Sequence, residues 1–434
     1  MELTAQLTAL LGTEVVDLER MVGGASRQTW SFRAGADELV ARCDPPVSPG
    51  HSAPRGGAMA LEASLLRAAE AAGVPVPQVV ATADHLIVVR RLTGETLARR
   101  ILRDDTYATA REVLTRQCGE ALARLHTGVA PADVPGLPVD DDPIATLRAT
   151  LDELGEPHPA LELGLLRLAR TRPAPAAPAV VHGDFRLGNL MVDGEGLVGV
   201  LDWELAHLGD PAEDLGWLCV PSWRFGGASP VAGVGSREEL LAAYAEAGGA
   251  RVDLATLRWW EALGTLRWGV ICVRQAAAHL TGAVRSVELA AIGRRTCEVE
   301  LDLLEELGQS EVTQPVRTRP PELEPESLAG LHDRPTAGEL VEAVREWIER
   351  LELHGHDAFL ARVSARALQI VERELAAPEL ERRHRERLDT LGVTDDAELA
   401  AQVRAGRDDA TTVEAIRASV VDKLRIADPR LLQR

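Results

Sequence analysis

Apolar and polar residues alternate along the first hundred positions in short runs that are interrupted by turn residues. Residues 29–34 (TWSFRA) and 39–43 (LVARC) have strand length, and the GADE turn between them predicts a β-hairpin. Residues 77–95 predict two further strands around a turn, and residues 60–73 have the spacing of a helix that ends at Gly73. Hairpin connections make the sheet antiparallel. The pattern therefore predicts an α+β class, with a small sheet, one inserted helix and a mainly helical region.

Only helical periodicity appears after a proline-rich stretch at residues 314–327 (QPVRTRPPELEPES). Two Thr-x-x-Glu sequences, which start at Thr336 and Thr411, fit capping boxes at helix starts. Apolar side chains recur on one helical face at Leu340, Val344, Ile348 and Leu351. We therefore expect a bundle of roughly four or five helices, with its many charged side chains on the outer face.

Composition and charge narrow the class of protein. Of the 434 residues, 46% are hydrophobic, and the formal net charge is −20. Such an acidic balance argues against a nucleic acid or an anionic membrane surface as the partner. The five cysteines are scattered without a CxxC pair, and no window approaches about 18 uninterrupted apolar residues. We expect reduced thiols, no membrane segment and a cytoplasmic location.

Several common enzyme signatures are excluded by the residues themselves. A Walker A loop needs a lysine, and the only lysine in the chain is Lys423, near its end. GxSxG and HExxH are both absent, so the sequence does not indicate a serine hydrolase or a zinc protease of those types. The glycines Gly194, Gly196 and Gly199 spell GxGxxG, but a strand-like run follows them in place of a helix. They therefore indicate a hairpin turn.

The candidate chemistry lies in residues 180–204 (VVHGDFRLGNLMVDGEGLVGVLDWE). His182, Asp184 and Asn189 have the order H-x-D-x-x-x-x-N, and Asp202 follows at the end of a strand-like run. Phosphoryl transfer needs these residue types: one carboxylate accepts the proton of the attacking hydroxyl, while an amide oxygen and a second carboxylate hold Mg²⁺. The alternative is that Asp184 and Asn189 only form turns, which is their commonest role.

The stretches HGDFRLGNLM and LDWE resemble the catalytic loop and the metal-binding aspartate of the aminoglycoside phosphotransferase family. The similarity runs from about residue 10 to 310, because GGASRQTWSF, LVARCDPP, EASLLRAAEAAGVPVP and GDPAEDLGWL also occur in the family's order. The branch that the chain resembles contains kinase domains fused to acyl-CoA dehydrogenases. The C-terminal part resembles a helical accessory domain of unknown function found beside such kinases.

This resemblance implies a protein-kinase-like fold of two lobes that enclose ATP. It divides the chain into a nucleotide-binding lobe, a helical catalytic lobe, a proline-rich linker and a helical accessory domain, at residues 1–93, 94–313, 314–330 and 331–434.

The resemblance also implies roles for particular residues. Asp184 is expected to be the general base, Asn189 and Asp202 the Mg²⁺ ligands, and His182 a residue that braces the catalytic loop. The local sequence, in contrast, gives Asp210 a structural role: it precedes Pro211 and is expected to cap a helix start, with Glu213 as its capping-box partner. Asp214 is likewise expected to be structural.

Nucleotide contacts follow from the same resemblance. The phosphate-covering loop would lie at residues 23–29 (GGASRQT), where Gly23 and Gly24 allow close backbone approach and Ser26 bonds a phosphate oxygen. A plain hairpin turn is the alternative there. The backbone from Arg90 to Leu92 would meet the adenine.

Arg42 departs from the family pattern, because protein kinases place a lysine at this strand position. The expected partner of this cation is Glu62 on the following helix, although an ordinary exposed helix position is the alternative for Glu62. Arginine keeps the charge and can fork onto two oxygens, but it is bulkier than lysine. Val40 lies on the same strand face as Arg42, so both can face one cleft.

We therefore expect an ATP-dependent and Mg²⁺-dependent kinase that phosphorylates a hydroxyl of a small molecule, with a hydroxyacyl-CoA-type metabolite as the family precedent. One alternative is an aminoglycoside- or macrolide-type antibiotic kinase. Another is a pseudokinase-like nucleotide-binding module, motivated by Arg42. A third is a scaffold that recruits a partner protein through residues 331–434.

Overall fold

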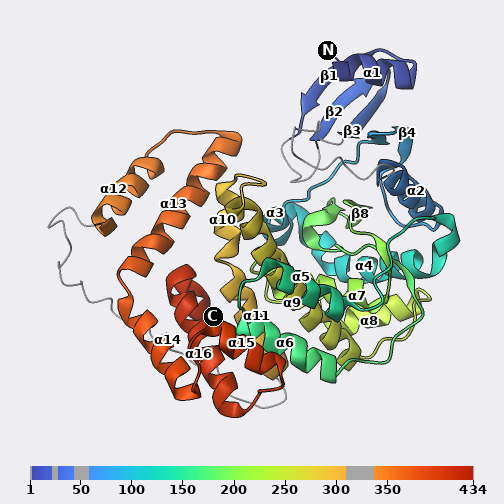
Figure 1. Ribbon diagram of the computed structural model, residues 1–434. Helices are drawn as coiled ribbons and strands as arrows, with labels where there is room; N and C mark the ends of the chain where they lie inside the picture. The colour runs from blue at the N-terminus through green and yellow to red at the C-terminus, as the bar shows by residue number, and fades with distance from the viewer. Residues whose placement is uncertain (1, 22–27, 44–57, 309–336, 434) are drawn as a thin grey trace. The chain divides into compact units, whose positions relative to one another are not determined.

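The computed structural model describes residues 2–21, 28–43, 58–308 and 337–433. The chain divides into two compact units, one of residues 1–142 and 173–264 and the other of residues 143–172 and 265–434. Figure 1 traces the chain from the first strands in blue to the last helices in red. Each unit is described by itself below.

Within the described residues, the first unit opens with a five-stranded antiparallel sheet. In the spatial order β1-β2-β3-β5-β4, its strands are β1 (Val15–Arg20), β2 (Gln28–Ala34), β3 (Asp37–Cys43), β5 (Leu86–Arg90) and β4 (Val79–Ala83). Alternate side chains of β3 and β5 form a small core with α1 (Glu2–Leu11), through Leu7, Leu39, Ala41, Leu86 and Val88. The hairpins and the α+β class predicted from the sequence are confirmed.

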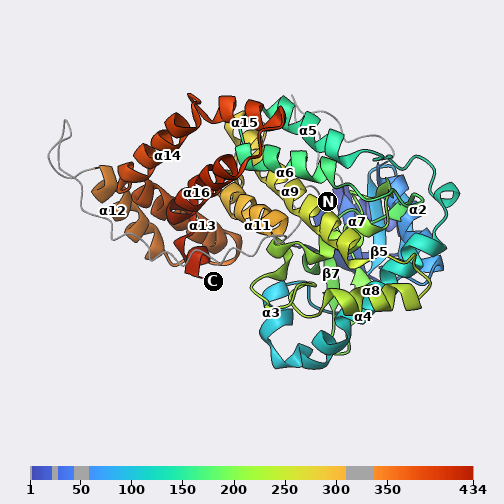
Figure 2. The same ribbon diagram turned by 90° about the horizontal axis from the view of Figure 1, so that it is seen from below.

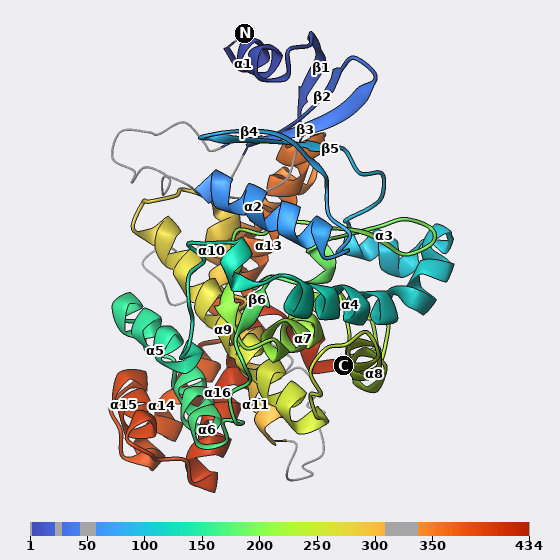
Figure 3. The same ribbon diagram turned by 90° about the vertical axis from the view of Figure 1, so that its right-hand side faces the viewer.

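The other face of the sheet packs against α2 (Ala58–Ala71), which lies below it in Figure 3. Val40 packs there beside the buried Ile87 and Val89, so Arg42, two residues along β3, lies on the same face. The helix ends where the sequence predicts. Gly73 has a φ of 80°, and Val74 donates its N–H to the carbonyl of Ala69.

Two antiparallel strand pairs carry the polar residues of the 180–204 stretch. Strand β6 (Ala179–Val181) pairs with β9 (His207–Gly209), and β7 (Leu190–Val192) pairs with β8 (Leu197–Val200). Between β7 and β8, Asp193 accepts hydrogen bonds from the N–H groups of Glu195 and Gly196. The GxGxxG glycines therefore lie in a hairpin, as the sequence indicated.

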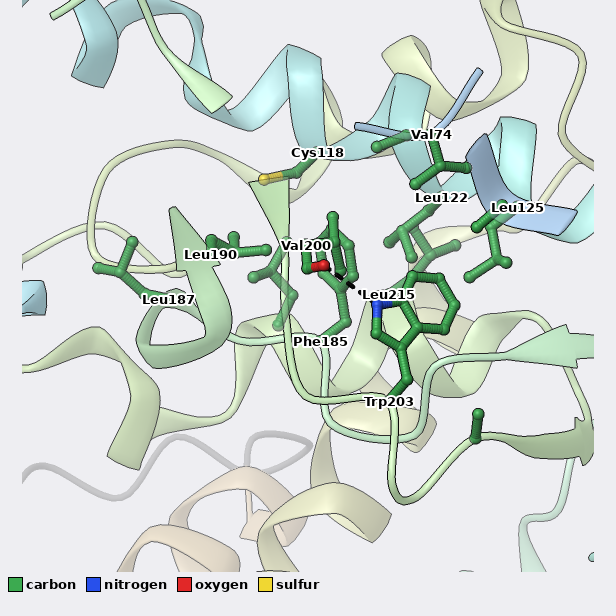
Figure 4. Close-up of a cluster of buried hydrophobic side chains, with 14 of the residues drawn as sticks. Val74, Cys118, Leu122, Leu125, Phe185, Leu187, Leu190, Val200, Trp203 and Leu215 are labelled. Carbon is green, nitrogen blue, oxygen red and sulfur yellow. Dashed lines mark hydrogen bonds between the residues drawn. The ribbon is translucent and has the colours of Figure 1, made fainter. Parts of the chain in front are cut away.

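A buried apolar cluster fixes these strand pairs against helices of the same unit. Figure 4 shows Phe185, Leu190 and Trp203 beside Leu122 of α4 (Ala108–Gly128) and Leu215 of α7 (Ala212–Cys219). The Trp203 indole donates to the carbonyl of Val200 at 3.0 Å. Because the residues that flank the polar side chains are fully packed, the polar residues have little freedom to move.

The remaining described elements of the first unit are helical. In Figure 2, α4 lies beside α8 (Arg237–Glu246). A Cβ at Gly119 of α4 would lie 2.9 Å from the carbonyl of Leu240, so glycine permits this close crossing. The other α-helices are α3 (Ala98–Arg103) and the first part of α9 (Leu254–Leu280), in which the division into units falls. Among the 3₁₀ segments, η4 (Pro221–Arg224) follows α7.

The described part of the second unit is built of helices alone. They are α5 (Pro143–Leu154), α6 (Pro159–Arg170), the rest of α9, α10 (Val287–Gly293), α11 (Thr296–Gly308), α12 (Ala337–Glu349), α13 (Gly355–Leu375), α14 (Pro378–Leu391), α15 (Asp396–Arg404) and α16 (Ala410–Ala427). Leu163, Leu304, Leu399, Val403 and Leu424 are among the buried residues of its core.

Two details of this unit differ from the sequence prediction. Helix α16 is capped by Asp409, whose side chain accepts the N–H of Thr412, and Thr411 does not cap it. On α12, the predicted core positions Leu340 and Val344 are 55% and 50% exposed. No helix in the described ranges is long and apolar enough to cross a membrane.

Candidate active site

The loop after β6 turns sharply because of Gly183. Its φ is 75°, and a Cβ there would collide with the carbonyl oxygen of Leu205. Only glycine fits both the backbone angle and the space. This turn carries the chain from the buried strand to Asp184, which therefore leaves the core in a defined direction.

The Asp184 carboxylate is held by three donors. Its Oδ1 accepts from the Trp217 indole at 2.8 Å and from Arg186 Nε at 2.9 Å, while its Oδ2 accepts from Asn189 Nδ2 at 2.6 Å. Arg186 also lies over the ring of Trp223, 4.7 Å from its centroid. The Asp184 side chain is 14% exposed, so its carboxylate is oriented yet accessible to a small molecule. These features suit a positioned proton acceptor.

Asn189 and Asp202 offer the oxygen ligands that Mg²⁺ prefers. Asn189 Nδ2 also donates to the Asp184 carbonyl at 3.0 Å, so its amide nitrogen is committed and its amide oxygen is the remaining polar atom. Asp202 follows β8 with a φ of 65°, a backbone region that costs energy for a residue with a side chain. One carboxylate and one amide oxygen fit a magnesium ion that is completed by phosphate oxygens.

Arg42 joins the sheet to this hairpin. It pairs with Glu62 of α2, which is 2% exposed, and its Nη2 lies 2.9 Å from Asp202 Oδ1. Burial by itself lowers the pKa of Arg42, but the negative charges of Glu62 and Asp202 outweigh this effect and raise it. The guanidinium is therefore a fixed positive charge beside the predicted metal ligand, and its fork serves two carboxylates at once.

His182 is fully buried and braces the loop as a neutral imidazole. Its Nε2 lies 3.0 Å from the Leu201 carbonyl and must donate, while its Nδ1 accepts the N–H of Asp184 at 3.1 Å. Burial lowers the pKa of His182, against the opposing charges of Asp214 and Asp184. Protonation of Nδ1 would break the bond to Asp184, so only the neutral ring satisfies both contacts.

Asp214 of α7 binds the backbone of the same loop. Its Oδ2 accepts the N–H of His182 at 2.7 Å, its Oδ1 accepts the N–H of Gly183 at 2.9 Å, and His126 Nε2 lies 3.1 Å away. Burial by itself would raise the pKa of Asp214, but the hydrogen bonds and charges of His126 and His182 lower it. An ionised carboxylate that satisfies two backbone donors fits the structural role expected from the sequence.

The other predicted nucleotide contacts are only partly described. Gly23, Gly24 and Ser26 lie outside the described residues. Arg90 ends β5, and its exposed side chain donates to Gln78 and Asp37. Leu92, two residues further on, makes no backbone hydrogen bond with another described residue. Its backbone is therefore available to a ligand.

Trp217 and Arg186 are the site residues that sequence reasoning missed. Trp217 follows Asp214 by three residues, so both lie on one face of α7 and reach the same loop. That spacing was visible in the sequence, but α7 is buried along its whole length, and its apolar neighbours gave no sign of which face meets Asp184. Arg186 lies inside the motif, yet its role depends on the distant Trp223.

Comparison with known proteins assigns the chain to a family. The model of the phosphotransferase enzyme family abbreviated APH matches residues 17–260, more than half of the chain. The chain therefore belongs to the phosphotransferase enzyme family. A model of a domain of unknown function, DUF6285, matches residues 351–431, in line with the accessory domain expected from the resemblance.

Two individual proteins are similar to part of the chain. Mouse acyl-CoA dehydrogenase family member 10 is 29% identical over 231 residues, which are 49% of this chain and 21% of that protein. Human acyl-CoA dehydrogenase family member 11 is 30% identical over 113 residues, 24% of this chain and 14% of that protein. The chain thus spans about a fifth or less of the length of these relatives.

A solved structure supports the fold. A Ralstonia eutropha protein described as an aminoglycoside phosphotransferase superposes with a TM-score of 0.56 at 20% identity, over 71% of this chain and 97% of that one. The predicted protein-kinase-like fold is confirmed.

Proposed function

We propose that this protein transfers the γ-phosphate of ATP to a hydroxyl group of a small molecule, with Asp184 as the general base. The observation that carries the proposal is two bonded pairs of side chains, which the backbone bond from Leu201 N–H to the Asn189 carbonyl holds next to each other. Asn189 bonds Asp184, and Arg42 of the sheet pairs with Asp202 of the adjacent hairpin. A proton acceptor, two oxygen ligands and a fixed cation are the set that phosphoryl transfer needs.

In the proposed reaction, Asp184 Oδ2 accepts the proton of the acceptor hydroxyl. The Trp217 indole and Arg186 donate to Oδ1 and so fix the orientation of the carboxylate. Asn189 and Asp202 would hold Mg²⁺, and Arg42 orients Asp202 while its charge attracts the phosphates. Bound Mg-ATP supplies the phosphoryl group and the metal charge that neutralises its oxygens. The backbone at Arg90 and Leu92 would meet the adenine.

For the acceptor we favour a hydroxyacyl-CoA-type metabolite over an aminoglycoside or macrolide. Support comes from the two matched relatives, which are acyl-CoA dehydrogenase family members. The division of the chain at residues 93, 313 and 330, its cytoplasmic location, and the recruitment of a partner protein through residues 331–434 remain proposals. In favour of the cytoplasm, all five cysteines are buried thiols.

The decisive experiment compares wild type with Asp184→Asn. We expect wild type to transfer the γ-phosphate of ATP to at least one member of a panel of hydroxyacyl-CoAs, aminoglycosides and macrolides. Asp184→Asn should lower turnover by at least about a thousandfold and leave ATP binding intact. Asp17→Asn is a matched control, because Asp17 is an exposed strand residue on β1.

The pseudokinase alternative makes a different prediction for the same experiment. If wild type binds ATP but shows no turnover that Asp184→Asn removes, the chain is a nucleotide-binding module and the kinase proposal fails. The scaffold alternative is tested by capture of a partner with the full chain, compared with a chain that lacks residues 331–434.

A further inference from the structure

A cavity of about 550 Å³ lies in the first unit, apart from the side chains assigned to catalysis. Its walls come from the corner between α3 and α4 and from the loop after η4, with Leu102 and Phe225 as apolar members. Its volume lies in the range of small-molecule sites, about 300 to 1,000 Å³.

The loop that forms one wall is held in a strained shape. Phe225 and Ala232 have φ angles of 47° and 49°, in the left-handed region that side chains rarely adopt. A Cβ at Gly227 would lie 2.5 Å from Gly233, so the two glycines let the loop cross itself. Strain of this kind persists where the surroundings enforce it, and it gathers at ligand-binding sites.

A buried ion-pair cluster enforces the shape of this loop. Glu261 is 2% exposed and accepts hydrogen bonds from Arg224 at 2.7 Å and from Arg237 at 2.5 and 2.7 Å. Arg224 immediately precedes Phe225, and Arg237 begins α8. The loop is therefore clamped at both ends, and the cavity wall is formed before any ligand arrives.

Aromatic rings connect the cavity to the candidate base. Phe225, which lines the cavity, lies 6.4 Å from the ring of Trp223, and Trp223 lies 5.4 Å from Trp217. Trp217 donates to Asp184. The wall residue Phe225 is therefore linked through two buried tryptophans to the side chain that orients the base.

The charged residues of the cavity favour an anion. Arg103 and Arg111 line it, against the single carboxylate of Glu112. Arg103 is exposed and has no ion-pair partner among the described residues. Arg111 uses Nη1 to donate to the carbonyls of Ile101 and Asp104, which fixes the guanidinium and leaves Nη2 and Nε without a bond to another described residue.

We propose that this cavity binds an anionic group of the acceptor molecule, a phosphate or a carboxylate, while Phe225 and Leu102 contact an apolar part of the same molecule. This inference rests on the proposed function and refines it. The acceptor is an amphiphilic anion that is anchored in this cavity and presents its hydroxyl to Asp184. Paired guanidiniums bind phosphate and carboxylate well and repel the ammonium groups of an aminoglycoside.

The kinetic test compares two acceptors that share one hydroxyl and one thioester. 3-Hydroxybutyryl-CoA carries phosphates, and 3-hydroxybutyryl-N-acetylcysteamine carries none. We expect Arg103→Gln to raise the ratio of the KM for the CoA ester to the KM for the N-acetylcysteamine ester about tenfold. In Arg103→Lys this ratio should return most of the way to the wild-type value. Arg99→Gln is the matched control, because Arg99 is exposed on the same helix and does not line the cavity. An equal ratio in Arg103→Gln and Arg99→Gln would overturn the assignment of the cavity to phosphate, and the adipate titration below then decides whether the anion proposal falls as a whole.

A binding test separates this inference from the proposed function. Coenzyme A and adipate are titrated calorimetrically into wild type and Arg103→Gln. Both lack the 3-hydroxyl of the hydroxybutyryl group that the kinetic pair presents for phosphorylation. Weaker binding of coenzyme A alone in the variant assigns the cavity to phosphate, and weaker binding of adipate assigns it to carboxylate.

Each proposal can therefore fail by itself. If wild type transfers no phosphate to any acceptor but binds coenzyme A or adipate through Arg103, the kinase proposal falls and the cavity assignment stands. If neither probe depends on Arg103, or if kanamycin binds and Glu112→Gln weakens it, the anion proposal falls whatever the activity.

Discussion

The substitution Arg42→Met tests the reasoning about the bridge between the sheet and the metal hairpin. Methionine keeps the apolar stem and much of the volume of arginine, but it removes the guanidinium from Glu62 and Asp202. Glu62 is 2% exposed and would keep its carboxylate without the opposite charge of Arg42. Asp202 is 35% exposed, so water can replace its lost contact.

The expected loss of stability follows from how deeply the Glu62 and Asp202 side chains are buried. Removing one partner of a buried ion pair costs about 3 to 5 kcal/mol, and the partly exposed pair adds less than about 1 kcal/mol. Because Arg42 is itself 20% exposed, the lower end applies, so we expect about 3 kcal/mol. In a unit of this size, that corresponds to a fall in Tm of roughly 6 to 12 °C.

The assay is equilibrium unfolding in urea, with Arg33→Met as the control. Arg33 lies on the neighbouring strand and pairs with Asp17, but both side chains are more than half exposed, so its loss should cost less than about 1 kcal/mol. The double variant Arg42→Met/Glu62→Gln should recover about half of the loss, because the buried charge is also removed. If Arg42→Met costs no more than Arg33→Met, the buried-pair argument is wrong.

Three further predictions concern the loop and its supports. His182→Gln should be less stable than wild type above pH 6.5, and this difference in stability should shrink as the pH falls below about 6.5. The reason is that the pKa of His182 is lowered in the folded state, so protonation favours the unfolded chain. Urea unfolding at pH 5 to 8 measures the difference, and a difference that does not change with pH would contradict the prediction. Trp217→Phe should lower kcat about tenfold without changing the KM for ATP, since one hydrogen bond to the base is lost. Trp30→Phe should leave kcat unchanged, since the buried Trp30 indole nitrogen has no partner among the described residues; equal kcat in the two variants would refute this role. Gly216→Ala should destabilise the protein by about 1 to 3 kcal/mol, because the new Cβ would lie 2.6 Å from the backbone of α9. Gly308→Ala is the control and should not destabilise it, since the space around Gly308 is open. Equal Tm values for the two variants would contradict the packing argument.

The local parts of the fold could be predicted from the sequence because they depend on neighbouring residues. The β2–β3 hairpin follows from two strand-length runs and a turn, and the end of α2 follows from Gly73. The turn between β7 and β8 follows from Asp193 and its two glycines. In each case the backbone preference of a few adjacent residues decides the shape.

Helix starts were predicted less well, since several polar residues compete for one position. The sequence placed a cap at Thr411, but Asp409 takes that role two residues earlier. Asp210 does accept the N–H of Ala212 at the start of α7, whereas the side chain of Glu213 turns to His207 and does not complete a capping box. Which side chain caps a helix depends on what else lies within its reach.

The sequence by itself determined which residues are chemically suited to the site and in which order they occur, because motif spacing is local. Only the tertiary structure brought Arg42, Glu62 and Asp202 together, since 20 and 160 residues separate Arg42 from its two partners. It also decided that Trp217 meets Asp184, and that Leu340 and Val344 stay exposed where their periodicity predicted a core. Periodicity shows that a helix has an apolar face, but only the packing of distant segments decides what covers that face.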